Sequence, residues 1–393
     1  MDNDINTYIK SNSVDDTLLL HANNMTYINI YKKDIIKDII DLCYCCTNEN
    51  EIDIKKSISY YVNAYVENYI NNFLKNTKIY ESRKKKVVKL KNLKLPEQRS
   101  IEWFNIRKKV LTASSLASAL NKCHYKSRDE LILDKINNDN KPLEFNPITE
   151  WGVKYEEIAT KFYEHINNVK ILEFGMVPHP KFPIFGASPD GICCENSRSE
   201  YIGRMLEIKC PPKRKFTKSV PKNYMYQMQG QLECCDLDEC DFLQVKVEEY
   251  ETYDNYLEKL SVDQIGVTND NFPCGCVVTY KKLFSDKLNY LYPELYKSKQ
   301  YYEEWEQNQK DWIKNNDHEY YETKWWFISR YECTLVKRDQ ELWNSVMPEI
   351  IKFWKDVEFY KIDNNKNDLI KIVESKKFKY PVTIINTKEC LID

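Results

Sequence analysis

Three charged residues, Asp190, Glu207 and Lys209, have types and a spacing that could do chemistry together. Asp190 lies in the turn Ser-Pro-Asp-Gly, where the proline sets its own φ and Gly191 tolerates a positive φ. Glu207 and Lys209 are two residues apart in the strand-like run MLEIKC, so their side chains share the face opposite the apolar ones. A solvated pair on a charged strand face gives the same pattern. The surrounding elements must decide between the two interpretations.

Two more polar residues are expected beside the same strands. Glu156 lies on the preceding helix, next to its apolar stripe, and Gln227 lies on the following helix. Carboxylates that converge near a strand carbonyl suit a hard divalent ion such as Mg²⁺. A neighbouring lysine would orient or deprotonate a bound water and offset charge that develops on phosphorus. The set therefore predicts metal-assisted chemistry at a phosphate.

The segments around these residues alternate between helix-like and strand-like patterns. The predicted order is helix, strand, strand, strand, helix, strand, in the runs NPITEWGVKYEEIATKFYEHI, KILEFGMVPHP, FPIFGASPDGICC, MLEIKC, KNYMYQMQGQLECC and DFLQVKVEEY. The apolar stripe of the first helix consists of Trp151, Tyr155, Ile158, Phe162 and Ile166. Further along, KWWFISRYECTLV reads as a strand, and YYEEWEQNQKDWIKNN and QELWNSVMPEIIKFWKDVEFY read as helices. This order predicts an α/β sheet flanked by helices.

The bulk composition limits the classes of protein. The chain has 393 residues, is 42% hydrophobic and 30% charged, and has a net charge of −2. It is long enough for a large domain and a second unit, and any nucleic-acid surface must be a local patch. No run approaches the roughly 18 apolar residues of a membrane span, and the first residues, MDNDINTYIK, do not resemble a signal peptide. We therefore expect an intracellular protein without a membrane partner.

The 14 cysteines are best interpreted as reduced thiols, because disulfides are rare inside cells. None of them forms a paired C-x₂-C set with zinc-finger spacing. Small buried apolar residues are the favoured role, and a zinc or iron–sulfur site is the less favoured alternative.

The first 95 residues differ in texture from the rest. Apolar residues recur there at three- and four-residue steps, as in Ile58, Val62 and Tyr65, which predicts helices. The basic run RKKKVVKLKNLK, from Arg83 to Lys94, reads as a linker or extended arm. It could contact DNA phosphates or act as a nuclear address, but a solvated linker is favoured. The predicted division is a helical extension with a basic linker over 1–95 and a second domain over 96–393.

From Arg99 onward the run EWFNIRKKVLTASSLASAL predicts a helix, a short turn and a second helix. The second helix is expected to start near residues 112–115, where Thr and Ser are good N-cap residues. Arg107 near the end of the first helix and Ser114 at the start of the second would together make an anion site, a guanidinium fork beside a helix N-terminus.

Five motifs in this order, EWFNIRKKVLTAS, WGVKYE, ASPDG, LEIKCP and YMYQMQ, resemble the lambda exonuclease and YqaJ viral recombinase family. This family is a branch of the PD-(D/E)xK nuclease superfamily. The resemblance covers about residues 99–248, with a weaker echo in VKRDQELWNSVMPEIIKFWKDV. It implies a restriction-endonuclease-like α/β (α+β) core with a central mixed sheet, and it is silent about the first 95 residues.

The resemblance implies roles for the site residues. Asp190 and Glu207 would bind the metal, with the Ile208 carbonyl as a further ligand, and Lys209 would be the catalytic lysine. Glu156 would complete the metal shell or serve a second ion. The metal would be Mg²⁺, with Mn²⁺ as a substitute.

Three further residues match other positions of the family. Gln227 would position the attacking water or the lysine, and Arg107 and Ser114 would bind the terminal 5′-phosphate of DNA. Alternatives remain open for each. Glu156 could be solvated, as helix glutamates such as the adjacent Glu157 usually are, Gln229 could replace Gln227, and Arg107 could only cover the ring of Trp103.

The function implied is digestion of duplex DNA from 5′-phosphorylated ends, which leaves 3′ single strands for recombination or repair, in a viral setting within a host cell or virion. The implied partners are DNA ends, a single-strand annealing protein and further copies of the chain, since the phage relative is a trimer. The additional segments put that assembly in doubt. The alternatives are a RecB-like or iron–sulfur nuclease, a structure-specific endonuclease, or a non-cleaving protein that binds DNA ends.

Overall fold

The computed structural model describes residues 1–45, 52–137, 146–197, 199–213, 216, 219–262 and 265–379. The chain divides into two compact units, Met1–Val88 and Lys89–Asp393. This division lies seven residues before the predicted boundary at residue 95.

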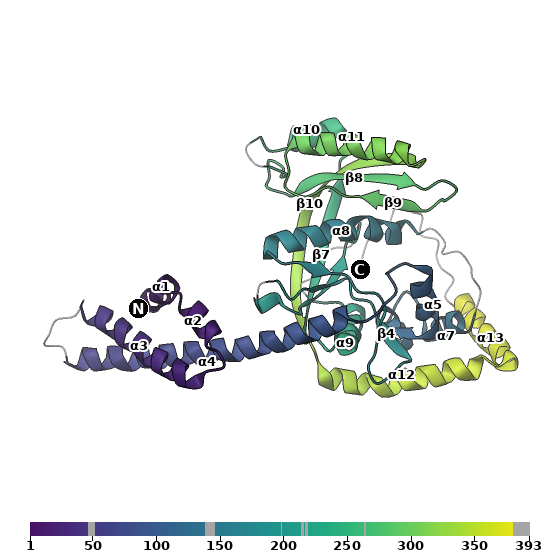
Figure 1. Cartoon of the computed structure of the whole chain (residues 1–393). Helices are drawn as coiled ribbons and strands as arrows, with labels where there is room; N and C mark the ends of the chain where they lie inside the picture. Colours follow the sequence, from purple (N-terminus) through teal and green to yellow (C-terminus); the bar gives the residue numbers. More distant parts are fainter. Residues whose placement is uncertain are drawn as a thin grey trace. The chain divides into compact units, whose positions relative to one another are not determined.

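Unit 1 is helical. It contains α1 (Asp2–Ser11), α2 (Val14–Leu20), α3 (Met25–Tyr44) and the long helix α4 (Ile52–Lys91). Its core is an aliphatic cluster that includes Ile5, Ile35, Val62 and Ile70, each at most 2% exposed. Helix α3 starts at Asn24, whose side chain accepts a hydrogen bond from the backbone N–H of Tyr27, 3.1 Å away. The helical patterning of this region is thus present in the structure (Figure 1).

The basic run is helical rather than extended, although the boundary between the two units, after Val88, does fall within it. Helix α4 continues through Lys91, so residues 83–91 of the run are helical. Arg83, Val87 and Leu90 recur at helical spacing and are only 8%, 0% and 6% exposed. Lysine is a good helix former, and no Gly or Pro interrupts the run before Pro96. A buried stripe hidden among the charges therefore keeps this segment helical.

Unit 2 is built around a mixed sheet of seven strands, in the order β2-β5-β6-β7-β10-β8-β9. Strands β6 and β7 are parallel, and the other pairs are antiparallel. A smaller sheet has the order β1-β4-β3. The strands are β1 (Leu111–Thr112), β2 (Ile171–Leu172), β3 (Val177–Pro178), β4 (Phe185–Ala187), β5 (Gly191–Cys193), β6 (Met205–Lys209), β7 (Glu239–Glu249), β8 (Cys274–Lys281), β9 (Leu288–Leu291) and β10 (Glu319–Lys337).

Helices cover this sheet (Figure 1). They are α5 (Ile101–Lys109), α6 (Leu116–Ala119), α7 (Arg128–Ile136), α8 (Pro147–Asn167), α9 (Lys222–Cys235), α10 (Tyr253–Lys259), α11 (Lys299–Asn315), α12 (Gln340–Tyr360) and α13 (Asp363–Lys379), with 3₁₀ turns at Ala113–Ser115 and Ser199–Tyr201. Helix α8 packs on β6, and α9 packs on β3, β4 and β7. The α/β fold with a mixed sheet flanked by helices is confirmed.

Helices α8 and α9 lie on opposite faces of strand β6. Leu206 and Ile208 share a core with Tyr155 and Ile158 of α8. Glu207, between them, points to the other face, toward α9. The alternation predicted for MLEIKC is therefore present, but its polar face is covered by a helix. Glu207 has no exposed surface, which excludes the solvated pair.

Several local predictions need correction. The second helix does start near residues 112–115, as expected, but it is short: the 3₁₀ turn Ala113–Ser115 leads into α6, which has four residues. Ile166 of the expected stripe on α8 is 39% exposed, because the last turn of α8 extends beyond the sheet core. Strands β8 and β9 and helices α7, α10 and α13 had no counterpart among the predicted elements. Among the described residues, no helix is long and apolar enough to cross a membrane.

Candidate active site

The turn that carries Asp190 is held between β4 and β5. The side chain of Gln98 donates to the carbonyl oxygens of Pro189 and Phe174, at 3.0 and 2.8 Å. Gly191 does not have a positive φ, contrary to expectation; instead, a Cβ there would lie 2.2 Å from a methyl carbon of Ile171. Close approach of β2 therefore requires the glycine. This packing presents Asp190 to strand β6.

The Asp190 carboxylate binds the neighbouring strand. Its Oδ2 accepts a hydrogen bond from the backbone N–H of Ile208 at 2.7 Å. Burial and the nearby charge of Glu207 raise the pKa of Asp190 well above its usual range, against the opposing effects of Lys209 and of this hydrogen bond. Two acidic side chains thus share a buried space that would favour a cation.

Glu207 is the most enclosed charged residue of the site. Lys209 donates to its Oε1, as does the side-chain amide of Gln227 at 2.6 Å. The amide of Gln231 donates to Oε2 at 2.7 Å. A fully buried carboxylate is tolerated only when its oxygens are paired in this way.

Lys209 lies between the two carboxylates and an aromatic ring. Its Nζ contacts Glu207 and lies 5.2 Å from the centre of the Tyr224 ring. Burial alone would lower the pKa of Lys209, but Glu207 and Asp190 outweigh burial and raise it. The arrangement stabilises the charged ammonium rather than the neutral amine. It therefore favours charge stabilisation over proton abstraction for this lysine.

Glu156 reaches the site from α8 and pairs with Arg99. The distance between Arg99 Nη2 and Glu156 Oε2 is 2.9 Å. Burial raises the pKa of Glu156, although Arg99 and Lys209 act in the opposite direction. Glu157 instead pairs with Lys161 on its own helix, at 3.6 Å. Of the two adjacent glutamates, the structure places Glu156 at the site.

A pocket of about 170 Å³ joins these residues to the predicted phosphate-binding residues. Its lining comes from α5, the 3₁₀ turn, α8, the Asp190 turn and α9. The lining residues are Gln98, Arg99, Trp103, Arg107, Thr112, Ala113, Ser114, Glu156, Ser188, Asp190, Gln227 and Gln231. Two of the metal-site candidates, Asp190 and Glu156, therefore share a cavity with both end-binding candidates.

Arg107 satisfies both interpretations of its role. Its guanidinium lies 4.3 Å from the centre of the Trp103 ring, and its Nη2 donates to Ser114 Oγ at 3.2 Å. Trp103 is in turn held by a hydrogen bond from its Nε1 to Ser188 Oγ, at 2.9 Å. Burial lowers the pKa of Arg107 to about 10, so the group stays charged at neutral pH. Ser114 lies inside a 3₁₀ turn rather than at the start of a long helix, so this anion site depends on side chains and not on a helix dipole.

Helix α9 presents Gln227 and not Gln229 to the site. The side chain of Gln229 points the other way: it donates to the carbonyl of Lys337 at 2.9 Å and accepts from the N–H of Asp339 at 2.7 Å. Gln231 also faces Glu207 and was absent from the predicted set. Its position four residues after Gln227, one helical turn away on the same face, is the signal that could have identified it.

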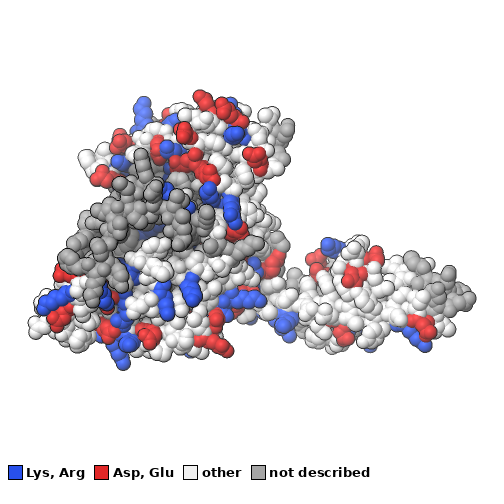
Figure 2. Space-filling model, turned by 180° about the vertical axis from the view of Figure 1, so that it is seen from behind, with Lys and Arg blue, Asp and Glu red and all other residues white. Residues whose placement is uncertain are grey.

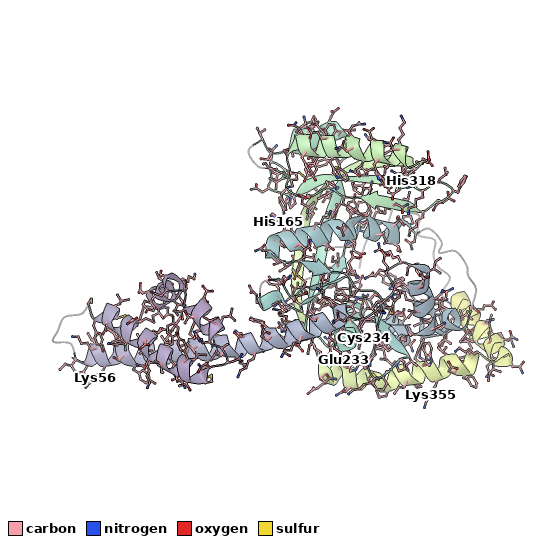
Figure 3. The ribbon with its side chains drawn as sticks, viewed as in Figure 1. Lys56, His165, Glu233, Cys234, His318 and Lys355 are labelled. Atoms are coloured by element: carbon pink, nitrogen blue, oxygen red, sulfur yellow. The ribbon has the colours of Figure 1, made fainter. Side chains whose placement is uncertain are left out.

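The far side of α9 is fixed to the junction between β10 and α12. Arg338 contacts both carboxylate oxygens of Glu233, at 2.9 and 2.7 Å, and Asp236 at 2.9 Å. Glu233 and its neighbour Cys234 mark this part of α9 in Figure 3. The clamp leaves α9 little freedom to rotate, so the two glutamines keep their register with Glu207.

The oxygen atoms at this site are of the kind that binds a divalent cation, although they are not arranged as a closed metal-binding cluster. Within the described residues, no three His, Cys, Asp or Glu side chains converge closely enough to hold a metal. Asp190 and Glu156 are nevertheless acidic groups whose charged forms are disfavoured by burial and by Glu207. The side-chain carbonyl oxygen of Gln231 is buried without a partner. Oxygen donors with excess negative charge are the ligands that Mg²⁺ and Mn²⁺ prefer, so the residues fit.

The cysteines play no part in this site. Eight of the described cysteines are buried: Cys193, Cys194, Cys210, Cys234, Cys235, Cys240, Cys274 and Cys276. Burial raises the pKa of such thiols, for example that of Cys235 to about 12. A thiol of this kind is a neutral core group at physiological pH.

The mixed sheet and the arrangement of Asp190, Glu207 and Lys209 agree with what the resemblance to PD-(D/E)xK nucleases implies. Residues 102–238 match the model of the YqaJ-like viral recombinase domain, which confirms the predicted resemblance over this part of the chain.

Similar proteins occur in large DNA viruses. The chain is 32% identical over 311 residues to an uncharacterized protein of Acanthamoeba polyphaga mimivirus, an alignment that covers 72% of this chain and 56% of that protein. It is 30% identical over 159 residues to a protein of African swine fever virus (strain Badajoz 1971 Vero-adapted), covering 35% of this chain and 46% of that protein. The chain thus spans about half the length of the curated relatives it matches.

Two solved structures show a distant similarity to the chain. An alkaline exonuclease (LHK-Exo) from Laribacter hongkongensis is 19% identical with a TM-score of 0.39, covering 71% of this chain and 99% of that one. A phage-related exonuclease from Haemophilus somnus 129PT is 14% identical with a TM-score of 0.32, covering 68% and 96%.

Proposed function

We propose that the chain is a metal-dependent exonuclease that digests duplex DNA from 5′-phosphorylated ends and leaves 3′ single strands for recombination or repair. The observation that carries this proposal is one pocket that holds both kinds of group. Asp190, Glu156, Arg107 and Ser114 line the pocket, and Gln227 and Gln231 connect it to Glu207, which in turn contacts Lys209. The matched recombinase domain supports DNA as the substrate.

Asp190, Glu207, the Ile208 carbonyl and Glu156 would hold the metal. When bound, Mg²⁺ or Mn²⁺ supplies a water of lowered pKa and polarises the phosphate. Glu156 is paired with Arg99 in this structure. To bind the metal, its carboxylate would have to break this ion pair and turn toward Asp190 and Glu207.

The remaining polar residues act on the DNA. Lys209, kept charged by its two carboxylate neighbours, would stabilise the negative charge that accumulates on the scissile phosphate. Gln227 would hold Glu207 and orient the attacking water from the helix side. Arg107 and Ser114 would bind the terminal phosphate, with Trp103 keeping the guanidinium in place.

The direct test is digestion of linear duplex DNA by the full chain, with and without Mg²⁺. We expect digestion that depends on the metal and requires a DNA end. A label at the 5′ terminus of a strand should be released early, whereas a label at its 3′ terminus should be retained. Cutting of closed circular DNA would instead indicate an endonuclease. Binding of ends without digestion under any divalent ion would indicate a non-cleaving protein.

The terminal-phosphate pocket gives a prediction of its own. Arg107→Gln and Ser114→Ala should slow digestion of 5′-phosphorylated ends by about tenfold or more and change digestion of 5′-hydroxyl ends much less, because only the phosphate engages these groups. The measurement is the ratio of the two initial rates for each variant. Lys109→Gln, at the end of the same helix and outside the pocket lining, is the control. An equal loss on both ends would show that the two residues only support packing.

The lysines of the basic helical run give a prediction about DNA affinity. Lys84, Lys85, Lys89 and Lys94 are exposed, whereas Arg83 is buried and Lys91 pairs with Glu195. Replacing the four exposed lysines by Gln should weaken DNA binding. The slope of log K against log salt concentration should become less steep by about 0.9 for each phosphate contact that is lost. The rate of cleavage of bound DNA should not change.

The control for this prediction is Lys352→Gln with Lys355→Gln, two exposed lysines of α12, the second of which is labelled in Figure 3. On the face shown in Figure 2, both positive and negative side chains are present outside the grey region. If DNA binding weakens in the fourfold variant and not in the double variant, a general loss of positive charge does not explain the difference. An unchanged salt slope in the fourfold variant would show that the run is only a solvated helix face.

Association of the chain with further copies of itself remains a prediction, as does association with a single-strand annealing protein. Light scattering of the purified chain, with and without duplex DNA, tests the expected trimer.

A further inference from the structure

Gln231 stands out because nothing in the predicted site assigns it a role. Its side chain is 1% exposed, and it lies one turn after Gln227 on the same face of α9. The two amides bind different oxygens of one carboxylate: Gln227 donates to Oε1 of Glu207 and Gln231 to Oε2. Glu207 is therefore held on both oxygens by the same helix.

The orientation of the Gln231 amide follows from chemistry. An ionised carboxylate only accepts hydrogen bonds, so the NH₂ group must face Glu207 and the carbonyl oxygen must face away. The same NH₂ group lies 3.4 Å from the carbonyl of Ser188, a second acceptor. A flipped amide would place its oxygen against two acceptors at once.

The carbonyl oxygen of Gln231 is left without a donor from the protein. It is buried and has no hydrogen-bond partner among the described residues, although Gln231 lines the pocket beside Asp190 and Ser188. Buried acceptors are nearly always paired, with water where the protein supplies no donor. This oxygen therefore retains the capacity to accept a hydrogen bond.

We propose that Gln231 is a positioning residue for the metal site. Its NH₂ group fixes the rotamer of Glu207, and its carbonyl oxygen accepts a hydrogen bond from a water in the pocket. This inference rests on the proposed metal-dependent function. Groups that orient metal ligands in this way commonly change metal affinity by about 10- to 100-fold when removed.

Helix α9 offers a matched control. Gln229 is on the same helix, is 2% exposed, and uses both ends of its amide, but its partners are the backbone of Lys337 and Asp339. Gln229→Met and Gln231→Met are thus the same change at two equally buried positions. Only the second removes a contact with Glu207.

The experiment measures Mn²⁺ binding to the full chain by calorimetry, without DNA. Gln231→Met should weaken Mn²⁺ binding by about tenfold or more, and Gln229→Met should change it by less than about twofold, although both lower the melting temperature. Gln231→Ser, which leaves room for a water beside Glu207, should weaken binding in the same way and guards against misfolding of the Met variant. In cleavage assays, the Mg²⁺ concentration for half-maximal rate should rise for both Gln231 variants.

The outcomes separate the two proposals. Normal Mn²⁺ affinity in a folded Gln231 variant would overturn the positioning role and leave the proposed function intact. Equal losses at Gln229 and Gln231 would also overturn it, since they would indicate a general effect of loosening α9. A wild-type chain that binds no Mn²⁺ and digests no DNA would refute the proposed function itself.

Discussion

Asp190→Asn should reduce metal-dependent cleavage by at least about a hundredfold without destabilising the fold. A hundredfold loss corresponds to about 2.7 kcal/mol of transition-state stabilisation, a plausible share for one charged metal ligand. Asn keeps an oxygen that can accept the hydrogen bond from the Ile208 N–H, so the contact between the turn and β6 survives. Only the charge is lost.

The expected effect on stability has a definite sign. Burial and Glu207 raise the pKa of Asp190 in the folded protein, so its ionised form costs stability at any pH above the pKa in the unfolded chain. A neutral Asn removes this cost. The free energy of unfolding at pH 7, measured in urea without divalent ions, should therefore be unchanged or higher in the variant. Glu207→Ala is a poorer probe, because it would leave Lys209 and two amides without their partner.

Asp241→Asn is the matched control for this change. Asp241 is a buried aspartate on the adjacent strand β7, but it binds Tyr163 and Arg204 rather than the site. We expect this variant to be less stable, because an ion pair is lost, and to cleave at the normal rate while folded. Near-normal cleavage by Asp190→Asn would refute the assignment of Asp190 as a metal ligand.

Lys209→Met should also reduce cleavage by at least about a hundredfold, but for a different reason. The ammonium touches Glu207 and acts electrostatically on Asp190, two of the carboxylates that would hold the metal. Its removal takes away charge stabilisation in the transition state and leaves the metal ligands in place. Mn²⁺ affinity should be retained or increased, because Glu207 no longer shares its Oε1 with Lys209.

Binding and cleavage must be measured separately to test this prediction. Calorimetry gives the Mn²⁺ affinity, and single-turnover digestion at saturating metal gives the chemical step. The free energy of unfolding of Lys209→Met should be lower than that of the wild type, because the fully buried Glu207 loses its paired cation. Both assays should therefore be run well below the melting temperature of the variant. Lys246→Met is the control, because Lys246 pairs with Glu248 two residues away on an exposed strand face. Loss of Mn²⁺ binding in Lys209→Met would show that the lysine only supports the fold.

The sequence by itself determined the features that depend on local geometry. A strand alternates its side chains, so Glu207 and Lys209 had to share a face. The helices around Gln227 and around Trp343 lie at α9 and α12, as the patterns of those segments predicted. The order of the five motifs identified the family, because each motif is a short run whose spacing can be read directly.

Only the tertiary structure decided which residues meet across long separations. The spacing of Gln231 from Gln227 places both on one face of α9, but only packing brings Gln231 to the second oxygen of Glu207 and pairs Arg99 with Glu156. Strands β8 and β9 depend on pairing with β10 and with each other, which windows of a few residues do not reveal.

Burial was likewise decided by packing. The same charged pattern is solvated at Lys246 and Glu248 and enclosed at Glu207 and Lys209, because α9 covers only the second pair. The basic run was misjudged for the related reason that its buried residues, Val87 and Leu90, are outnumbered by lysines. Local sequence sets the direction of a side chain, but the elements packed against it set its solvation, and solvation determines its charge and chemistry.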